Sequence, residues 1–480
     1  MAKKDEQNFV MHIAKREDDF PQWYTDVILK TDMVDYSDVK GCMVIKPYGY
    51  GVWELIQSEM DKRFKETGHV NAYFPLFIPE SLLMKEAEHV EGFAPEVAWV
   101  THGGSEKLTE RLAIRPTSET IIGSMYSKWI QSYRDLPVLM NQWCNVVRWE
   151  KSTRPFLRTS EFLWQEGHTA HETFDEAQEE TMRMLGVYRE FAENVLAIPV
   201  ITGRKSEKEK FAGAQETYTM EAMMQDGKAL QMGTSHNMGT NFAKSYDIQY
   251  LSKEGKLEYC FTTSWGTSTR MIGGLIMVHG DDRGLVLPPR VAPIQVAILP
   301  IAQHKPGVLE KADELLQTLK AAGVRAKVDS SDQTAGWKFN QWEMKGVPIR
   351  IEVGPKDIEK NQVVAVRRDD LEKQFIPMEE VSARIPAMLD EVHDGLFNKA
   401  LKLREEKTTD ATTFEQLCDG VQHGFVRAMW CGETGCELAI KEKSGGATTR
   451  CAPFEQKELS DVCVHCGKPA KTMTYFAKAY

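Results

Sequence analysis

Apolar side chains recur every three or four residues in one early segment of the chain, at Trp53, Ile56, Met60 and Phe64. This spacing places them on one face of a helix, so it predicts an amphipathic helix that ends near residues 67–68. The following segment, VNAYFPLFIP, predicts a strand, but it contains Pro75. Because proline cannot donate a hydrogen bond in a β-ladder, we expect this strand at a sheet edge or at a subunit contact.

Two later apolar runs, VLMNQWCNVVRWE and TSEFLWQEGH, have strand character and are joined by the polar segment KSTRPFLR. Together they predict a long antiparallel hairpin. Helical periodicity returns at residues 173–196 and predicts a second amphipathic helix.

The pattern changes after LVLPPRVAP, where strand-like runs such as IQVAILPI and VPIRIEV alternate with helical ones. This alternation predicts a separate small α/β domain with a mostly parallel sheet, linked through the proline-rich segment 288–293. A long helical region from about Met378 to Glu406 leads into a cysteine-rich tail. We expect domains at 1–287, 288–395 and 396–480.

The composition fits a protein with two or three cores, since 480 residues contain 42% hydrophobic and 27% charged side chains. A net charge of -11 argues against binding nucleic acid through a general basic field, but it leaves room for a local basic groove. The N-terminus is polar and no apolar run approaches the length that spans a bilayer. We therefore expect a cytoplasmic protein without a membrane segment.

The segment FLRTSEFLWQEGH combines rings with charge. Strand periodicity places Phe162, Trp164, Glu166 and His168 on one face and Glu161, Leu163 and Gln165 on the other. Buried polar groups need partners, so ordinary packing of the first face requires an internal network around Glu166 and His168. The alternative is that this face binds a ligand.

Arginines surround the same hairpin. Arg148 and Glu150 follow the first strand on one face, and the connecting segment adds Arg154 and Arg158. Guanidinium groups bind phosphates and a nearby ring, Phe162, can stack on a base, so the hairpin predicts a site for an anion that carries an aromatic base. A solvated charged hairpin is the plainer alternative.

Three further segments carry candidate groups. In RLAIRPTSETIIG, Thr117 and Glu119 are spaced to accept hydrogen bonds from an ammonium group, although Thr117 or Ser118 also suits a helix N-cap. ALQMGTSHNMG fits neither helix nor strand periodicity, so we expect a loop or strand end with Gln231, Thr234 and His236, and a structural role for His236 is the alternative. The last segment is SWGTSTRMIGG, where Arg270 follows a strand and begins a helix, a position that favours a terminal phosphate.

Five of the nine cysteines lie near the C-terminus. Cys431 and Cys436 form one close pair, and Cys463 and Cys466 form another about thirty residues later. Two such pairs are typical of a closed tetrahedral zinc site that stabilises folding. Cys451 is a fifth candidate ligand, which could replace Cys463, and His465 is a weaker one.

Taken together, the early helix with its proline strand, the arginine hairpin and the strand-Arg-helix resemble motifs 1, 2 and 3 of the class II aminoacyl-tRNA synthetases. The region AGWKFNQWEMKGVPIRIEVGPKD resembles their anticodon-binding domain, and RPTSET, FLRTSEFLWQEGH, GTSH, SWGTSTR and the tail resemble the prolyl-tRNA synthetases of the archaeal/eukaryote-like type. The resemblance covers nearly the whole chain. It implies an α+β catalytic domain with an antiparallel sheet, an α/β anticodon-binding domain and a small zinc-binding C-terminal domain.

The resemblance also implies roles for single residues. The proline site would consist of Thr117, Glu119, Arg148, Trp164, Glu166, His168 and His236, with Glu119 receiving the secondary ammonium. ATP would be held by Arg148, Glu150, Arg158, Thr159, Phe162, Gln231, Thr234, Ser268 and Arg270. Phe162 would stack on adenine, Arg148 would contact the α-phosphate and the proline carboxylate, and Arg270 would contact the γ-phosphate.

A member of this family activates L-proline with ATP and Mg2+ and transfers the prolyl group to the 3' end of tRNA(Pro), without a protein nucleophile. Arg148 and Arg270 would be the catalytic groups. Glu343 and Arg350 are candidates for reading guanine edges in the anticodon, although nearby basic residues could bind the RNA backbone instead. Those basic residues are Lys338, Lys356, Arg367 and Arg368.

Motifs 2 and 3 are separated by only about a hundred residues, so the editing insertion of bacterial-type enzymes has no room and alanine must be cleared elsewhere. The proline strand indicates a homodimer. Members often end in a tyrosine that approaches the catalytic domain, as Tyr480 would.

One alternative is a non-catalytic synthetase-like RNA-binding paralogue, which would be expected to lack Arg148, Arg270 or Glu119. Another is a threonyl enzyme, which would need a cysteine for zinc in the amino-acid pocket.

Overall fold

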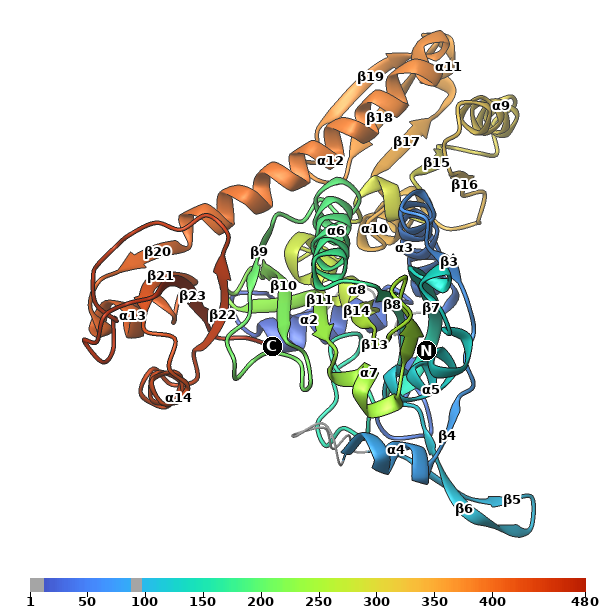
Figure 1. Cartoon of the computed structure of the whole chain (residues 1–480). Coiled ribbons are helices and arrows are strands. Elements are labelled where there is room, and N and C mark those ends of the chain that lie inside the picture. The colour runs from blue at the N-terminus through green and yellow to red at the C-terminus, as the bar shows by residue number, and fades with distance from the viewer. Residues whose placement is uncertain (1–12, 88–96) are drawn as a thin grey trace.

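The computed structural model describes residues 13–87 and 97–480. Its largest sheet has eleven strands in the order β20-β21-β23-β22-β9-β10-β11-β14-β8-β7-β3 (Figure 1). The central strands are β9 (Val200–Arg204), β10 (Glu216–Met223), β11 (Ala229–Gly239), β14 (Phe261–Ser268), β8 (Glu161–His171) and β7 (Val138–Val147), with β3 (Val70–Asn71) at the edge. Neighbours from β9 to β7 pair antiparallel, as expected for the catalytic domain.

The predicted long hairpin is present as β7 and β8. Its register pairs Cys144 with Trp164 and Gln142 with Glu166, so these four side chains share one face of the sheet. The opposite face is tightly packed, because a Cβ at Gly167 would lie only 2.0 Å from the ring of Trp265 on β14. Glycine at this position therefore lets the buried indole cross the back of the hairpin.

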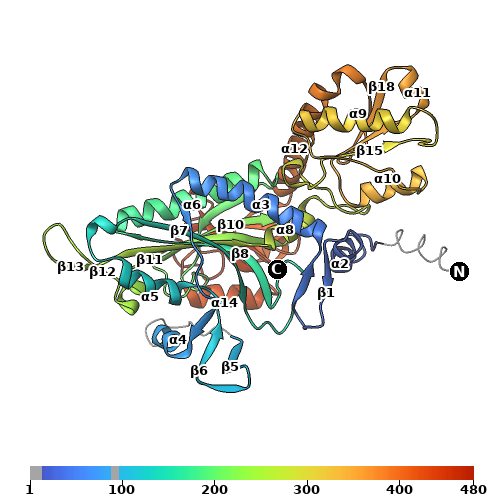
Figure 2. The same cartoon turned by 90° about the vertical axis from the view of Figure 1, so that its right-hand side faces the viewer.

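Two helices cover that opposite face of the sheet, α3 (Pro47–Glu66) and α6 (Phe174–Asn194) (Figure 2). Both were predicted from apolar spacing, and their buried residues, such as Phe64 and Tyr188, belong to the main hydrophobic core. Helix α6 begins with a capping box in which the side chains of Thr173 and Glu176 each bond the other residue's amide. Helix α8 (Arg270–His279) follows β14 directly, as expected.

Two sequence-based expectations were wrong. VNAYFPLFIP is not one strand: it contributes β3 and β4 (Phe77–Pro79), and Pro75 lies between them in irregular structure, where it removes no ladder hydrogen bond. ALQMGTSHNMG is a full strand, β11, and not a loop or strand end. Periodicity missed β11 because its side chains are largely buried on both faces, and a bulge between β10 and β11 interrupts the alternation.

The predicted α/β domain contains a five-stranded sheet of order β16-β15-β17-β18-β19. The strands are β15 (Val296–Pro300), β16 (Ala326–Val328), β17 (Ile349–Val353), β18 (Gln362–Arg367) and β19 (Lys373–Pro377). The expectation of a mostly parallel sheet was wrong: β15 pairs parallel with β16 and β17, but β17–β18 and β18–β19 are antiparallel. The short links after β17 and β18 allow these antiparallel returns.

Helices pack around this five-stranded sheet and extend beyond it. They are α9 (Val308–Ala321), α10 (Ala335–Met344), α11 (Pro355–Glu359) and α12 (Val381–Glu406). The long predicted helix is α12, which runs from the five-stranded sheet to the C-terminal strands (Figure 1).

The C-terminal strands continue the large sheet instead of forming a separate one. They are β20 (Thr408–Ala411), β21 (Phe425–Trp430), β22 (Thr448–Pro453) and β23 (Thr472–Ala477), with helices α13 (Phe414–Gly420) and α14 (Thr434–Lys443). Strand β22 pairs with β9 at Ala452–Arg204 and Pro453–Gly203. A Cβ at Gly203 would lie 2.3 Å from the carbonyl oxygen of Ala452, so this close approach requires glycine.

Smaller elements complete the chain. They are α2 (Phe20–Lys30), β1 (Val34–Tyr36), β2 (Met43–Ile45), α4 (Glu80–Ala87), β5 (Trp99–Gly103), β6 (Glu106–Ile114), α5 (Glu119–Trp129), α7 (Asn241–Tyr246), β12 (Gln249–Leu251) and β13 (Leu257–Tyr259). In the described ranges no helix is both long and apolar enough to cross a bilayer.

Candidate functional site

A cavity of about 250 Å³ opens on the face of the large sheet that α3 and α6 leave uncovered. Its floor comes from alternate residues of four strands, because paired positions in β8, β14, β11 and β10 point to the same side. The predicted site residues that line it are Thr117, Glu119, Arg148, Phe162, Trp164, Glu166, His168, Gln231, Thr234, His236, Ser268 and Arg270. The fold thus brings together residues from four separate sequence segments.

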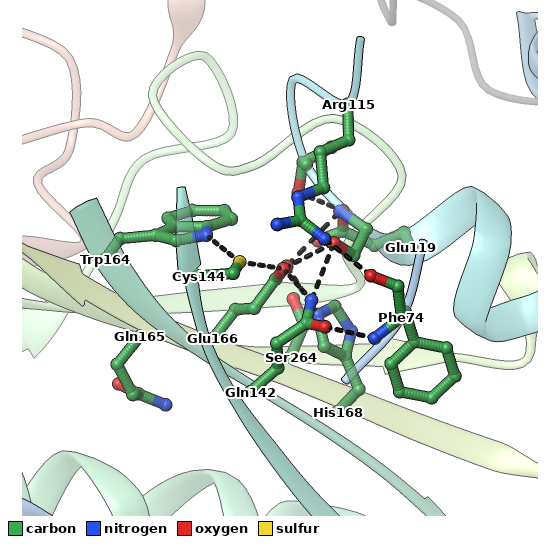
Figure 3. Close-up of polar contacts among 12 residues, drawn as sticks. Phe74, Arg115, Glu119, Gln142, Cys144, Trp164, Gln165, Glu166, His168 and Ser264 are labelled. Atoms are coloured by element: carbon green, nitrogen blue, oxygen red, sulfur yellow. Dashed lines mark hydrogen bonds and ion pairs between the residues drawn. The ribbon is translucent and has the colours of Figure 1, made fainter. Parts of the chain in front are cut away.

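Glu166 is the centre of a buried hydrogen-bond network (Figure 3). Its carboxylate accepts from Gln142 Nε2 at 2.9 Å and from the Ser118 amide at 3.2 Å, and it lies 2.9 Å from His168 Nε2. Cys144 Sγ contacts it at 3.4 Å and accepts from Trp164 Nε1 at 3.2 Å. The internal network that ordinary packing of this face would require is therefore present, and it holds Trp164 and His168 at the cavity.

The charges of Glu166 and His168 stabilise each other. Burial acts to raise the pKa of Glu166, but the hydrogen bond and charge of His168, with the donors Ser118 and Gln142, leave it below its usual value. Burial likewise acts to lower the pKa of His168, but Glu166 raises it above the usual value. The two residues form a carboxylate–imidazolium pair under the cavity.

Arg148 and Arg270 both line the cavity. Arg148 donates from Nε to the Pro116 carbonyl at 3.0 Å, and its guanidinium carbon lies 5.4 Å from the Trp164 ring and 5.5 Å from the Phe162 ring. Arg270 donates from Nε to the Leu157 carbonyl at 3.0 Å. Burial, then the charges of Arg158 and Arg148, lower the pKa of Arg270 to about 10, so it stays protonated near neutral pH. Among the described residues neither guanidinium has an ion-pair partner, which suits a pair of anion donors.

Glu119 and His236 also line the cavity. Glu119 is the first residue of α5, and the Thr117 hydroxyl donates to its carboxylate. Ser118 is the N-cap residue, but its hydroxyl binds Glu166 and not a helix amide. His236 Nδ1 lies 2.9 Å from Thr217 Oγ1, and burial, with a smaller effect of His168, lowers its pKa to about 3. A carboxylate and a neutral imidazole therefore line the same cavity as Trp164.

Three predicted residues lie outside this lining. Glu150 and Arg158 form an exposed ion pair of 3.4 Å beyond the hairpin strands. Thr159 lines a neighbouring cavity on the other side of Phe162. All three are on the segment that joins β7 and β8.

Sequence analysis missed several lining residues, among them Glu209, Phe211, Thr217, Ser264 and Gly266. Ser264, Gly266 and Ser268 alternate along β14 as small side chains, a signal that could have revealed a flat floor. Gln142 and Cys144 were also missed, although the hairpin register places them opposite Glu166 and Trp164. Glu209 and Phe211 lie outside regular strands, and only the tertiary structure brings them here.

The four predicted zinc ligands converge. Their Sγ atoms all lie within 4.8 Å of one another, and Cys436–Cys463 and Cys431–Cys466 are 3.6 and 3.7 Å apart. A tetrahedral ion with Zn–S bonds of about 2.3 Å requires S···S distances of about 3.8 Å, so the cluster fits zinc. Cys451 is not in this group and lies against Gly203 on β9, so Cys463 and not Cys451 completes the cluster. His465 Nδ1 lies 3.4 Å from Cys436 Sγ, beside the cluster.

In the five-stranded domain, Glu343 and Arg350 are close neighbours. Arg350 Nη1 lies 3.9 Å from Glu343, while Arg350 also pairs with Glu352 at 3.0 Å and Glu343 with Arg283 at 2.7 Å. Lys338 and Arg368 were alternative RNA-backbone contacts, but they are 3% and 4% exposed. Arg368 is bonded to Asp281 and Lys338 to Asp329, so neither presents its charge to a backbone phosphate.

The last residue, Tyr480, docks on the catalytic sheet. Its amide donates to the Ala229 carbonyl at 3.1 Å and its hydroxyl to Asp226 at 2.7 Å. The Arg154 guanidinium lies 5.8 Å from its ring. The end of the chain thus contacts both β11 and the arginine-bearing hairpin segment.

Comparison with known families agrees with this architecture. Residues 99–279 match the model "tRNA synthetase class II core domain (G, H, P, S and T)", and residues 295–388 match "Anticodon binding domain". Residues 414–480 match "Prolyl-tRNA synthetase, C-terminal". The chain is therefore built on the catalytic core of the class II aminoacyl-tRNA synthetases.

Similar proteins of known name show which class II synthetase family the chain belongs to. The chain is 63% identical to the Proline--tRNA ligase of Alkaliphilus oremlandii and 64% identical to that of Ruminiclostridium cellulolyticum, over the full length of both chains in each comparison. A crystal structure of prolyl-tRNA synthetase from Cryptosporidium parvum, complexed with halofuginone and AMPPNP, superposes with a TM-score of 0.94 at 44% identity, covering 98% of this chain and 100% of that one. The chain belongs to the prolyl-tRNA synthetase family.

Proposed function

We infer that this protein is a proline--tRNA ligase that activates L-proline with ATP and transfers it to tRNA(Pro). The observation that carries the proposal is the cavity lined by Arg148 and Arg270, two half-buried cations without ion-pair partners among the described residues, and by the Glu119 carboxylate. Such a site accepts a substrate that is anionic along most of its length and cationic at one end. Full-length identity to proline--tRNA ligases supports this reading.

We assign the end of the cavity near Glu119 to proline. Glu119, oriented by the Thr117 hydroxyl, would accept from the secondary ammonium, while Trp164 and the neutral His236 would enclose the pyrrolidine ring. Glu166 and His168 would hold this wall in place from beneath. No cysteine is among the described residues that line the cavity, and Cys144, beside it, contacts Trp164 and Glu166. No thiolate is therefore free there to bind the zinc ion that a threonyl enzyme would need. Burial, with a further effect of Glu166, raises the pKa of the Cys144 thiol.

We assign the remaining cavity to ATP, which enters with Mg2+ bound to its phosphates. Phe162 would stack on adenine, and Gln231, Thr234 and Ser268 would supply hydrogen bonds from the sheet floor. Glu150, Arg158 and Thr159, on the segment that joins β7 and β8, would close over the nucleotide. Arg148 would hold the α-phosphate and the proline carboxylate together, and Arg270 the γ-phosphate.

The catalytic contribution of these groups is positioning and charge stabilisation. The proline carboxylate attacks the α-phosphorus, the bond to pyrophosphate breaks, and prolyl-adenylate forms. Arg148 would stabilise the charge that develops at the α-phosphate, and Arg270 would hold the departing pyrophosphate. The terminal hydroxyl of tRNA then takes the prolyl group and AMP leaves.

The rest of the chain would serve tRNA binding and stability. We propose three units, residues 1–287, 288–395 and 396–480, with α12 joining the last two as a continuous helix. Glu343 and Arg350 would read anticodon guanines. Cys431, Cys436, Cys463 and Cys466 would hold a structural zinc ion, which contributes folding energy and no chemistry.

We also propose a homodimer that forms through the segment around Pro75, because Val70, Tyr73 and Phe77 are 57%, 72% and 45% exposed there.

The archaeal/eukaryote-like subtype is supported by the short separation of the two arginine motifs and by the likeness to the Cryptosporidium parvum structure. A cytoplasmic location follows from the proposed role in tRNA charging.

The test is exchange of labelled pyrophosphate into ATP with each of the twenty amino acids in turn, followed by charging of tRNA(Pro). Exchange that depends on proline, with charging, is the expected result. Exchange with threonine in place of proline, or with no amino acid, would contradict the proposal, and the latter would favour a non-catalytic RNA-binding paralogue.

A further inference from the structure

Three charged side chains meet where the C-terminal strands join the catalytic sheet. Glu221 on β10 accepts from Arg450 Nε and Nη2 on β22 at 3.0 and 2.8 Å, and from Lys205 Nζ at 3.0 Å. Glu221 is fully buried, and Lys205 and Arg450 are 6% and 7% exposed. Nothing in the activity described above uses this Lys205–Glu221–Arg450 cluster.

The cluster lies on the same face of the sheet as the active site. Thr217, Thr219 and Glu221 form one row along β10, and their partners on β11 are His236, Thr234 and Gln231. All three partners line the cavity, and so does Thr217. Glu221 is therefore the direct cross-strand neighbour of Gln231, at the end of the row away from the proposed proline site.

The charges of the cluster do not cancel. Two cations surround one carboxylate, so a net charge of +1 is held in the interior, where charges act over longer distances than in water. Burial acts to raise the pKa of Glu221, but Arg450 and Lys205 keep it below its usual value. Burial lowers the pKa of Arg270, and the negative charge of the Glu221 carboxylate opposes that shift. The Glu221 carboxylate and the Arg270 guanidinium therefore interact electrostatically.

We propose that Arg450 is a positioning residue of the ATP half of the active site, supplied by the C-terminal part of the chain. By neutralising Glu221 it leaves a net positive charge beside Gln231 and prevents the carboxylate from competing with ATP phosphates for Arg270. This inference rests on the proposed assignment of that end of the cavity to ATP. The C-terminal part would then be required for nucleotide binding as well as for stability.

The proposal predicts that ATP binding follows the net charge of the cluster. Arg450→Met lowers that charge to zero and should raise KM for ATP about tenfold while KM for proline changes less than about twofold. Lys205→Met makes the same charge change from the catalytic side and should have the same effect. Adding Glu221→Gln to Arg450→Met restores the net charge of +1 and should restore KM for ATP to within about threefold of the wild type.

The experiment is proline-dependent pyrophosphate exchange with full-length protein, in which ATP and proline are titrated separately and thermal unfolding is recorded for each variant. Arg427→Met is the matched control, since Arg427 is a half-buried C-terminal arginine that pairs with Asp410 and lies outside the cluster. A rise in KM for ATP alone, reversed in the double variant, supports the proposal. The proposal would be overturned if both KM values changed equally, if neither changed, or if the double variant did not recover. The cluster would then only attach the C-terminal strands to the catalytic sheet. Absence of exchange in the wild type would instead contradict the proposed function.

Discussion

His168 Nε2 lies 2.9 Å from Glu166 Oε2, inside the sheet and directly under the cavity. Each residue alone would be a costly buried group, but as a pair they keep each other charged, while the Ser118 amide also donates to Oε2 and Gln142 donates to the other oxygen, Oε1. One pair therefore contributes both to the stability of the hairpin and to the shape of the proposed proline pocket.

The first prediction concerns the pH dependence of this pair. The pKa of Glu166 is lowered, so its contribution is present above the unfolded-state value of about 4.3 and is lost as pH falls through the folded-state value. The pKa of His168 is raised, so its contribution is full below about 6.5 and is lost as pH rises through the folded-state value. Both contributions are therefore full between these two unfolded-state values.

Glu166→Gln should accordingly lower the free energy of unfolding by about 3 kcal/mol in that window, and less at more acidic and more alkaline pH. Urea unfolding of the wild type and the variant across a pH series measures the difference. Glu193→Gln, at the surface of α6, is the control and should show little effect. A difference that does not vary with pH would contradict the coupling.

The second prediction concerns the back of the hairpin. Gly167→Ala places a Cβ about where the Trp265 ring now lies, so it should destabilise the protein by about 3 kcal/mol or more. Gly186→Ala in α6 is the matched control, because a Cβ there meets nothing within 4 Å and alanine favours the helix. The denaturant midpoints of both variants measure this difference in stability. Equal stability of the two variants would contradict the packing of Trp265 against Gly167.

The third prediction concerns the cysteine cluster. We expect one zinc ion per chain, lost in Cys463→Ser together with a fall in the melting temperature, because metal binding is coupled to folding. Cys451→Ser should retain the metal, since Cys451 lies outside the cluster. Metal analysis of purified protein measures this. Retention in Cys463→Ser with loss in Cys451→Ser would reverse the ligand assignment.

The fourth prediction separates RNA recognition from chemistry. Arg350→Ala should raise KM for tRNA(Pro) about tenfold, the loss of one guanine contact, and leave pyrophosphate exchange without tRNA unchanged. Arg384→Ala on α12, whose ion pair with Glu391 is at the surface, is the control. Unchanged charging kinetics in Arg350→Ala would remove this residue from the anticodon site.

Much of the fold could be predicted from the sequence where a pattern has one physical meaning. Apolar spacing identified α3 and α6, because in each helix one face is buried and the other is not, and two strand-like apolar runs joined by a polar segment identified the β7–β8 hairpin. The same reasoning failed for β11, which is largely buried on both faces and interrupted by a bulge. It also failed for β17–β18–β19, because the alternation of strands and helices was read as parallel pairing although the links after β17 and β18 are too short for parallel crossovers.

The candidate site divides in a similar way. Arg148 and Arg270 were found because arginines at a strand end and at a helix start indicate an anion site. The cysteine pairs were found because two closely spaced pairs indicate a zinc site. Gln142 and Cys144 were missed because an amide and a lone cysteine in a strand carry no signal until the register places them beside Glu166 and Trp164. The Glu221–Arg450 pair joins residues 229 positions apart and could not be predicted from local pattern at all.

The most direct test of the central claim is proline-dependent pyrophosphate exchange in Arg148→Ala, compared with the wild type and with Arg189→Ala on the exposed face of α6. Because Arg148 is assigned to the α-phosphate and the proline carboxylate, its loss should lower kcat/KM by at least about a hundredfold, with little change in melting temperature. The wild type and Arg189→Ala should exchange pyrophosphate with proline alone. Full activity in Arg148→Ala would contradict the assignment of this cavity as the site of proline activation.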